Sequence, residues 1–202
     1  MPLRSAAVEI AVQDVAGVRV ALAEGADRVE LCAALGLGGL TPSAGLVAKA
    51  VEEATEAGRS GFVHVLVRPR GGGFVYDADE LETTLADIRF ARQTGAGGVV
   101  VGALDEAGRI DRDAIARFVD AAGDLELTFH RAFDTLADPE AAAESLIELG
   151  AVRRADLRWR TAQHRRRRHP ARAGPAGRRR SAGDGGRGSP RTGHPRAHGR
   201  RG

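Results

Sequence analysis

One segment of the 202-residue sequence gathers side chains suited to binding an anion. Residues 68–73 read Arg-Pro-Arg-Gly-Gly-Gly. The guanidinium groups of Arg68 and Arg70 are planar forks of donors that match a carboxylate or a phosphate. The glycines allow the backbone to come close to a ligand. The alternative is a salt-bridged loop that closes over Glu9 or Glu30.

A second segment contains groups suited to proton transfer. His130 and Arg131 are followed by Asp134. An imidazole with a carboxylate partner is a candidate acid–base pair, because histidine titrates near neutral pH. Arg131 adds a further guanidinium for binding a substrate. The alternative is a buried histidine with only a structural role.

Each of these segments follows a predicted strand. Short apolar runs alternate with amphipathic stretches of near-3.6 periodicity over the first 150 residues. The predicted strands are Ala7–Val12, Arg28–Ala33, Val63–Arg68, Gly98–Leu104 and Leu125–His130. The predicted helices are Asp14–Glu24, Ser43–Ala57, Asp79–Thr94, Asp111–Ala122 and Asp138–Leu149, and a glycine follows each of them. Five strand–helix units in a row predict a parallel α/β sheet, either doubly wound or a (β/α) barrel.

The alternation of side chains along these strands separates an aliphatic face from an ionisable one. Glu9, Glu30, Arg68 and His130 fall on faces opposite to the valines, leucines and phenylalanines of their strands. If helices cover the aliphatic faces and the sheet curls into a barrel, the ionisable groups point inward. They then form either a polar site at the C-terminal mouth or a buried network in which Glu9 and Glu30 balance Arg68 and Arg70.

The charge of the chain divides it into two parts. Residues 1–150 hold 12 Arg, one Lys and 25 acidic residues, a net charge of −12, whereas residues 151–202 hold 17 Arg and two acids, a net charge of +15. The second part has three large apolar side chains, too few to offset the chain entropy lost on folding. We therefore expect a partial barrel domain over residues 1–152 and a disordered basic tail over residues 153–202. Such a tail binds polyanions without sequence specificity.

Composition excludes several classes of protein. One cysteine in 202 residues rules out a disulfide framework. No run of eighteen apolar residues could span a membrane, and the first residues lack the apolar core of a signal peptide. We therefore expect a cytoplasmic protein with no membrane partner and no specific nucleic-acid partner. The sequence leaves open whether the chain forms a homo-oligomer.

Three blocks of the sequence resemble the CutC family, named for copper homeostasis. They are ADRVELCAALGLGGLTPS at residues 26–43, VRPRGGGFVYDADE at residues 67–80 and LTFHRAFD at residues 127–134. The resemblance implies a cytosolic TIM-like (β/α) barrel that binds copper, with Cys32 and His130 as candidate metal contacts. The family often carries a second cysteine two residues after the glutamate of the first strand, where this sequence has Ala11.

Two functions follow from these observations. The resemblance favours a copper homeostasis protein whose cofactor is copper. The residues themselves favour a barrel enzyme acting on a small anionic compound, because Cu(I) prefers two or more soft ligands. In that case Arg68 and Arg70 hold the anion, and Glu9, Glu30 and Arg131 complete the set of substrate-binding residues. His130 then transfers a proton.

The resemblance ends near residue 152, with about five of the eight units of a barrel. Asp156-Leu157-Arg158-Trp159-Arg160, written in GC-rich codons and read one base later, gives Thr-Ser-Gly-Gly, which is like the family's sixth strand. We predict that a single-base frameshift near codons 152–156 produced the basic tail and a truncated, non-functional barrel. Resequencing of the gene should reveal the shift. An unshifted frame with no family-like alternative would contradict it.

Overall fold

The computed structural model describes residues 7–151, and these form one sheet with helices. The five strands are four residues long: β1 (Glu9–Val12), β2 (Arg28–Leu31), β3 (Val63–Leu66), β4 (Gly98–Val101) and β5 (Glu126–Phe129). The helices are α1 (Val15–Ala23), α2 (Ala44–Glu56), α3 (Ala78–Thr94), α4 (Arg112–Ala122) and α5 (Pro139–Glu148). Two 3-10 turns, η1 (Leu35–Leu37) and η2 (Arg131–Thr135), follow β2 and β5. The predicted tail lies outside the described residues.

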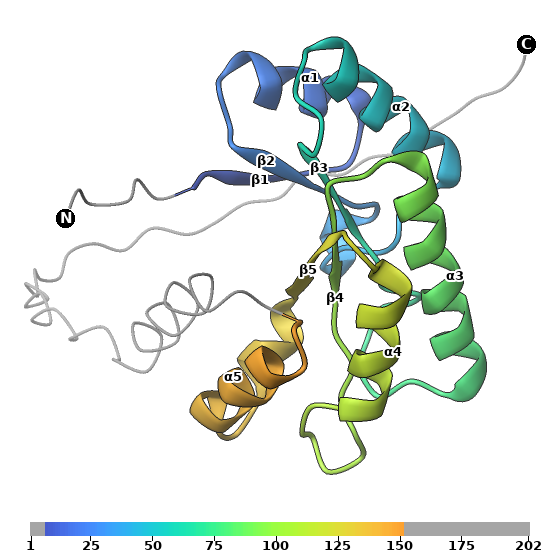
Figure 1. Cartoon of the computed structure of the whole chain (residues 1–202), viewed down its shortest axis with the longest axis vertical. Helices are drawn as coiled ribbons and strands as arrows, with labels where there is room; N and C mark the ends of the chain where they lie inside the picture. Colours follow the sequence, from blue (N-terminus) through green and yellow to red (C-terminus); the bar gives the residue numbers. More distant parts are fainter. Residues whose placement is uncertain (1–6, 152–202) are drawn as a thin grey trace, which may run out of the picture. The chain divides into compact units, whose positions relative to one another are not determined.

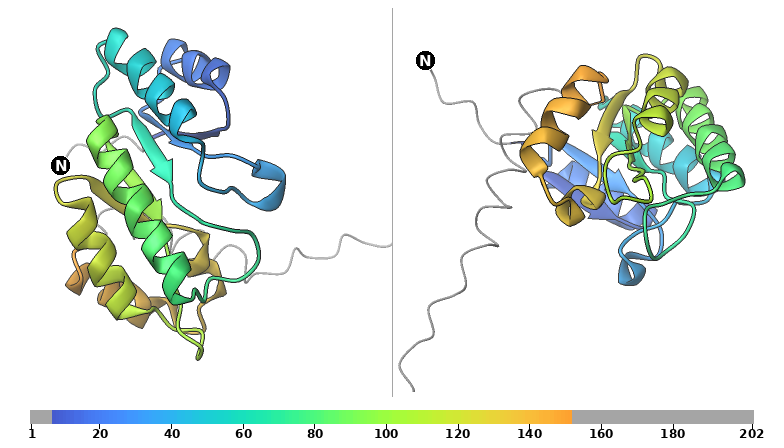
Figure 2. Two further views of the ribbon diagram at one scale, coloured as in Figure 1. Left: turned by 90° about the vertical axis from the view of Figure 1, so that its right-hand side faces the viewer. Right: turned by 90° about the horizontal axis from the view of Figure 1, so that it is seen from below.

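The sheet is parallel and its strands stand in the order of the sequence, β1-β2-β3-β4-β5. The register pairs Glu9 with Arg28, Glu30 with His64, and Gly98 with both His64 and Glu126. Figures 1 and 2 show α1 to α4 arranged side by side along one face of this sheet. Sequential parallel strands with crossover helices on one face have the connectivity of a (β/α) barrel. Five such units are present in residues 7–151.

Alternate side chains along each strand pack on opposite faces of the sheet and form two separate layers, as the alternation predicts. The larger layer lies between sheet and helices and includes Val29, Val65, Val99 and Phe129. A small inner cluster contains Cys32, Leu66 and Val100, which lie on the opposite face of β2, β3 and β4. The helices thus cover the aliphatic face and leave the ionisable face for the inside of the curved sheet.

The helix boundaries follow from capping. Ser43, Asp111 and Asp138, at which three of the predicted helices begin, accept hydrogen bonds from the first backbone N–H groups of α2, α4 and α5. Asp77 and Glu80 add a reciprocal capping box at the start of α3, one residue earlier than the predicted helix. No helix among the described residues is long and apolar enough to cross a membrane.

Two predictions about the strands need correction. The strands are shorter than predicted, because apolar residues such as Leu104 stay buried in the following loop after pairing has ended. Val8 and Ile10 were expected beneath the helical layer but are 52% and 41% exposed. Strand β1 stands at the edge of the sheet, so within residues 7–151 only β2 flanks it.

Candidate functional site

The guanidinium of Arg68 fastens together two loops at the C-terminal end of the strands, here called the mouth. Its Nη1 donates to the backbone carbonyls of Leu37, Gly38 and Gly39, at 3.5, 3.4 and 3.1 Å. Its Nη2 donates to the carbonyl of Gly72 at 2.8 Å. The side chain is 4% exposed. Arg68 therefore fixes the loop after β2 against the loop after β3.

Backbone bonds beside Arg68 reinforce this connection. The N–H of Arg68 donates to the Thr41 hydroxyl at 2.9 Å, and the Thr41 N–H donates to the Arg68 carbonyl at 3.0 Å. We call residues 34–39, which lie before Thr41, the lip. An antiparallel bridge between Ala33 and Leu40 closes its base. Figure 2 shows this segment projecting beyond the strands on the same side as the loop after β3.

A second guanidinium comes from the turn after β5. A Cβ atom built on Gly38 would lie 2.5 Å from Nη1 of Arg131 and 3.4 Å from Nη1 of Arg68. Two cationic groups therefore converge on one point of the lip. Gly38 is needed there both for this close approach and for its φ of +86°. Neither arginine forms an ion pair with a carboxylate among residues 7–151.

His130 stands at the mouth with one tautomer fixed by the backbone. Its Nδ1 accepts a hydrogen bond from the N–H of Ala132 at 3.2 Å. The neutral ring therefore carries its proton on Nε2. The imidazole is 4% exposed and packs between Phe74 and Phe129, with centroid distances of 5.0 and 5.9 Å. Arg68 lies 5.0 Å from the same Phe74 ring, so the guanidinium and the imidazole both contact Phe74.

The predicted partnership of His130 with Asp134 needs correction. Asp134 is exposed on η2, and a backbone amide orients the imidazole in its place. The 3-10 turn that begins at Arg131 brings the Ala132 N–H back to Nδ1, because His130 is the N-cap of that turn.

Arg70 is also not where the sequence prediction placed it. Its guanidinium pairs with the Glu80 carboxylate and donates to the carbonyl of Val75 at 2.8 Å. Glu80 in turn caps the start of α3. The guanidinium beside Glu80 holds the pKa of this carboxyl below its ordinary value. Arg70 thus secures the loop after β3 to α3 and does not point into the mouth.

The acidic residues of the inner face lie farther from the mouth than predicted. Glu9 pairs with Arg28, and Arg28 also donates to Glu126 at 3.1 Å. These three residues begin their strands, so the network closes the end of the sheet opposite to the mouth. The predicted balance between Glu9 and the arginines of residues 68–73 is therefore wrong. Glu30 is half-buried midway along the inner face, beside His64 in the register.

Cys32 belongs to the inner apolar cluster. It is fully buried against Leu66 and Val100, and its Sγ lies 3.5 Å from the Val12 carbonyl oxygen, to which the thiol donates. Burial, together with the charge of Glu30, raises the pKa of the thiol to about 11. In the described part of the chain, no group of three or more His, Cys, Asp or Glu side chains is arranged to hold a metal ion. The structure thus supplies Cys32 with the surroundings of a packed apolar residue.

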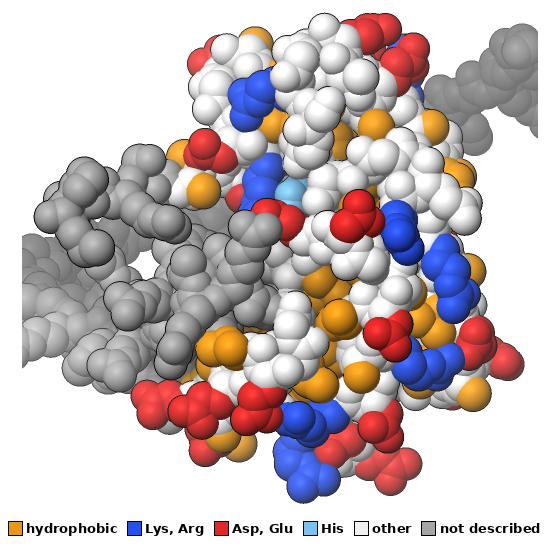
Figure 3. All heavy atoms as spheres, viewed as in Figure 1, with side chains coloured by type: hydrophobic (Ala, Val, Ile, Leu, Met, Phe, Trp, Pro, Cys, Tyr) orange, Lys and Arg blue, Asp and Glu red, His pale blue; other side chains and the backbone are white. Residues whose placement is uncertain are grey.

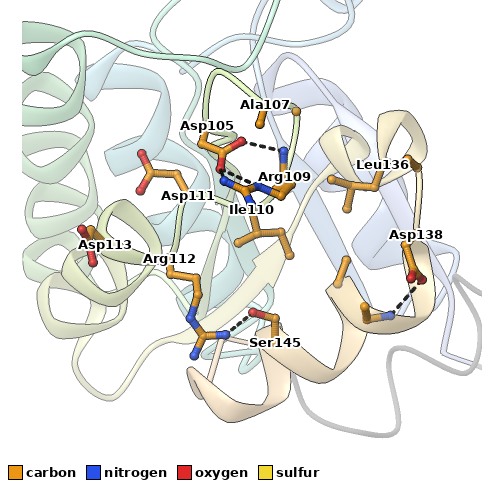
Figure 4. A pocket seen from close by; sticks show the side chains of 14 residues that line it. Asp105, Ala107, Arg109, Ile110, Asp111, Arg112, Asp113, Leu136, Asp138 and Ser145 are labelled. Atoms are coloured by element: carbon orange, nitrogen blue, oxygen red, sulfur yellow. Dashed lines mark hydrogen bonds and ion pairs between the residues drawn. The ribbon is translucent and has the colours of Figure 1, made fainter.

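A cavity of about 760 Å³ lies at the same end of the sheet, between the loop after β4, the start of α4 and the body of α5. Figure 4 shows Ile110 and Leu136 lining it, with Asp105 bonded to Arg109 and Arg112 bonded to Ser145. None of the residues predicted to bind or react lines this cavity. Its charged side chains hold the surrounding loops and helices together.

Comparison with known proteins identifies the family. The model of the CutC family matches residues 6–155. The chain belongs to the CutC family. This membership confirms the resemblance carried by the ELC, RPRGGG and FHRAFD segments.

Two curated CutC relatives show how much of the family the chain covers. The Mesorhizobium japonicum protein is 47% identical over 140 residues, which are 69% of this chain and 52% of the relative. The Bacteroides thetaiotaomicron protein is 46% identical over 145 residues, 72% of this chain and 57% of the relative. The chain therefore spans a little over half the length of these CutC relatives.

A crystal structure of CutC from Streptococcus agalactiae, provisionally described as a copper homeostasis protein, is also similar. It is 35% identical, with a TM-score of 0.67 over 71% of this chain and 69% of that one. The likeness confirms the predicted TIM-like (β/α) barrel architecture for the units that residues 7–151 contain.

Sequence reasoning missed three residues that shape the CutC barrel interior. Arg28 is two residues before Glu30, and Glu126 is four residues before His130, so each points to the same face of its strand. The alternation of side chains could therefore have predicted them. The role of Gly38 had no such signal, because it depends on where the Arg131 side chain comes to lie.

Titration of His64 is expected to make stability depend on pH. His64 is 3% exposed, and burial with the nearby Arg28 charge lowers its pKa to about 4, although Glu9 opposes the shift. Its Nε2 lies 4.0 Å from a Glu126 carboxylate oxygen. Below pH 6.5 the unfolded chain binds a proton that the folded chain rejects. The free energy of unfolding should therefore fall by about 3 kcal/mol between pH 6.5 and 4, and be fully retained above that range.

Denaturant titrations at several pH values measure this dependence. His64→Gln should flatten the slope between pH 6.5 and 4, whatever its effect on stability at pH 8. An unchanged slope in the variant would assign the dependence to other groups.

Proposed function

We propose that this chain is a barrel enzyme that acts on a small anionic compound at the mouth. The observation that carries the proposal is the convergence of Arg68 and Arg131 on Gly38, with no ion-paired carboxylate for either among residues 7–151. Two like charges held close together repel unless an anion lies near both. Active sites of (β/α) barrels lie at this end of the strands.

The residues of the mouth have distinct roles in this proposal. Arg131 is exposed and contacts the anion directly. Arg68 is buried against carbonyl oxygens, so it positions the lip and contributes its positive field. The fixed tautomer of His130 makes its Nε2–H a hydrogen-bond donor, so the neutral imidazole donates a hydrogen bond toward the substrate rather than accepting a proton there.

Copper binding is the second candidate, favoured by the description of the Streptococcus agalactiae relative. The residues present do not fit Cu(I) well. Cys32 is a single thiol, its pKa of about 11 keeps it protonated at neutral pH, and a thiol ligand must lose its proton. Ala11 stands where a second sulfur would be needed. We therefore derive no chemical step through copper.

We also propose a cytoplasmic location, supported by the use of one unpaired, buried cysteine in the whole sequence. The partner is then a small molecule of that compartment.

Removing the exposed guanidinium should weaken anion binding. Arg131→Gln should lower the affinity for inorganic phosphate at least about tenfold, since hydrogen bonds to charged groups contribute about 1.5–3 kcal/mol. Isothermal titration calorimetry on the full chain measures this affinity. Arg89→Gln is the matched control, because Arg89 is also exposed and forms no ion pair in the described structure.

The control also separates the mouth from the arginines of residues 151–202, which both variants retain. Equal phosphate affinities in the two variants would show that the mouth does not bind the anion, and the proposed function would then fail.

Removing the thiol should not affect metal binding. We expect Cys32→Ala to leave the Cu(I) affinity of the chain unchanged in competition with a Cu(I)-specific chelator, with circular dichroism as the check on folding. A fall of tenfold or more in a folded variant would instead assign the metal to Cys32 and restore the copper candidate.

A further inference from the structure

Exposed apolar side chains surround the cationic point of the mouth. Leu35 and Leu37, on the tip of the lip, are 40% and 67% exposed, and Val75, on the loop after β3, is 44% exposed. Leu37 directly precedes Gly38, where Arg68 and Arg131 converge. Three of the seven large apolar side chains that are exposed in residues 7–151 thus lie on the two loops joined by Arg68.

The lip holds its leucines outward in a fixed conformation. The N–H of Leu35 donates to the Gln13 side chain at 3.3 Å, and the Leu37 carbonyl accepts from Arg68. Ala34 has a φ of +50°, the sole non-glycine residue with positive φ among the described residues. A non-glycine residue in this region is strained, and such strain persists only where the surroundings impose it. The outward position of the leucines is therefore built into the fold.

We propose that the compound bound at the mouth is an anion with an apolar body, such as an alkyl monophosphate or carboxylate. Its charged head lies at Arg131, and its hydrocarbon part lies along Leu35 and Leu37. This inference rests on the proposed function, because it takes the anion site as given.

The charge of the chain around the site favours a small molecule over an anionic lipid surface. Residues 1–150 carry a net charge of −12, and Figure 3 shows acidic side chains gathered over α5. A membrane of anionic lipids is attracted by a spread of basic residues next to the apolar contact. Of the exposed arginines on the described loops at this end of the strands, Arg109 is paired with Asp105, which leaves Arg131 in a largely acidic domain.

A series of ligands with one head group and growing chains tests the inference. Methyl, butyl and hexyl phosphate are titrated calorimetrically into the full chain. Affinity should rise with chain length, by up to about fourfold for each methylene group that becomes buried. Leu37→Ser should reduce this increase. Val20→Ser is the matched control, because Val20 is 62% exposed on α1 and far in sequence from the lip.

The outcomes separate the two proposals. If methyl phosphate binds and affinity does not grow with chain length, or grows equally in Leu37→Ser, the apolar subsite is wrong and the anion site stands. If no phosphate binds in an Arg131-dependent way, the proposed function itself fails. Binding to vesicles of anionic phospholipid that Leu37→Ser abolishes, without a chain-length effect for the soluble esters, would overturn the choice of a small molecule.

Discussion

A buried guanidinium without an ion-paired carboxylate in the described structure is the constraint that organises this mouth. Desolvating a charge costs several kcal/mol unless hydrogen bonds replace the lost water. The carbonyl oxygens of the lip and of Gly72 provide those bonds for Arg68. Carbonyls satisfy the two terminal nitrogens but do not cancel the charge, and Nε has no hydrogen-bond partner within residues 7–151. The hydrogen bonds of Arg68 that join the two loops therefore also leave its positive charge at the mouth. The same residue thus sets the loop structure and the preference for an anion.

The inner face shows how one strand makes room for the two histidines of its neighbours. In β4 and the residue after it, the sequence Gly-Val-Val-Val-Gly places Gly98 beside the ring of His64 and Gly102 beside the ring of His130. A Cβ atom on either glycine would collide with an imidazole. The central Val100 packs with Cys32 and Leu66 between these two levels. The level of His64 joins the charge network of Arg28 and Glu126, and the level of His130 faces the mouth. An apolar layer thus separates these two polar regions.

The sequence predicted the elements and faces of this fold well, because these depend on local patterns. Apolar periodicity located all five helices, and acidic or hydroxyl caps with glycine ends set their limits to within one or two residues. The partners of individual charges could not be predicted in the same way. Arg70 found Glu80 on the following helix, and His130 found a backbone amide instead of Asp134. The partner of each side chain depends on the conformation of the loop that carries it, and residue types alone do not predict that conformation.

Two kinds of chemistry compete for the inner face, and burial decides between them. A soft metal requires thiolate, but the only thiol sits in an apolar layer where its pKa rises and ionisation is opposed. An oxygen anion requires N–H donors and positive charge, and the mouth supplies both through Arg131, Arg68 and the fixed Nε2–H of His130. A role in copper homeostasis, as described for a relative, does not by itself require a copper ligand in the chain. The geometry of these residues is therefore better matched to a compound that carries negative charge than to the metal.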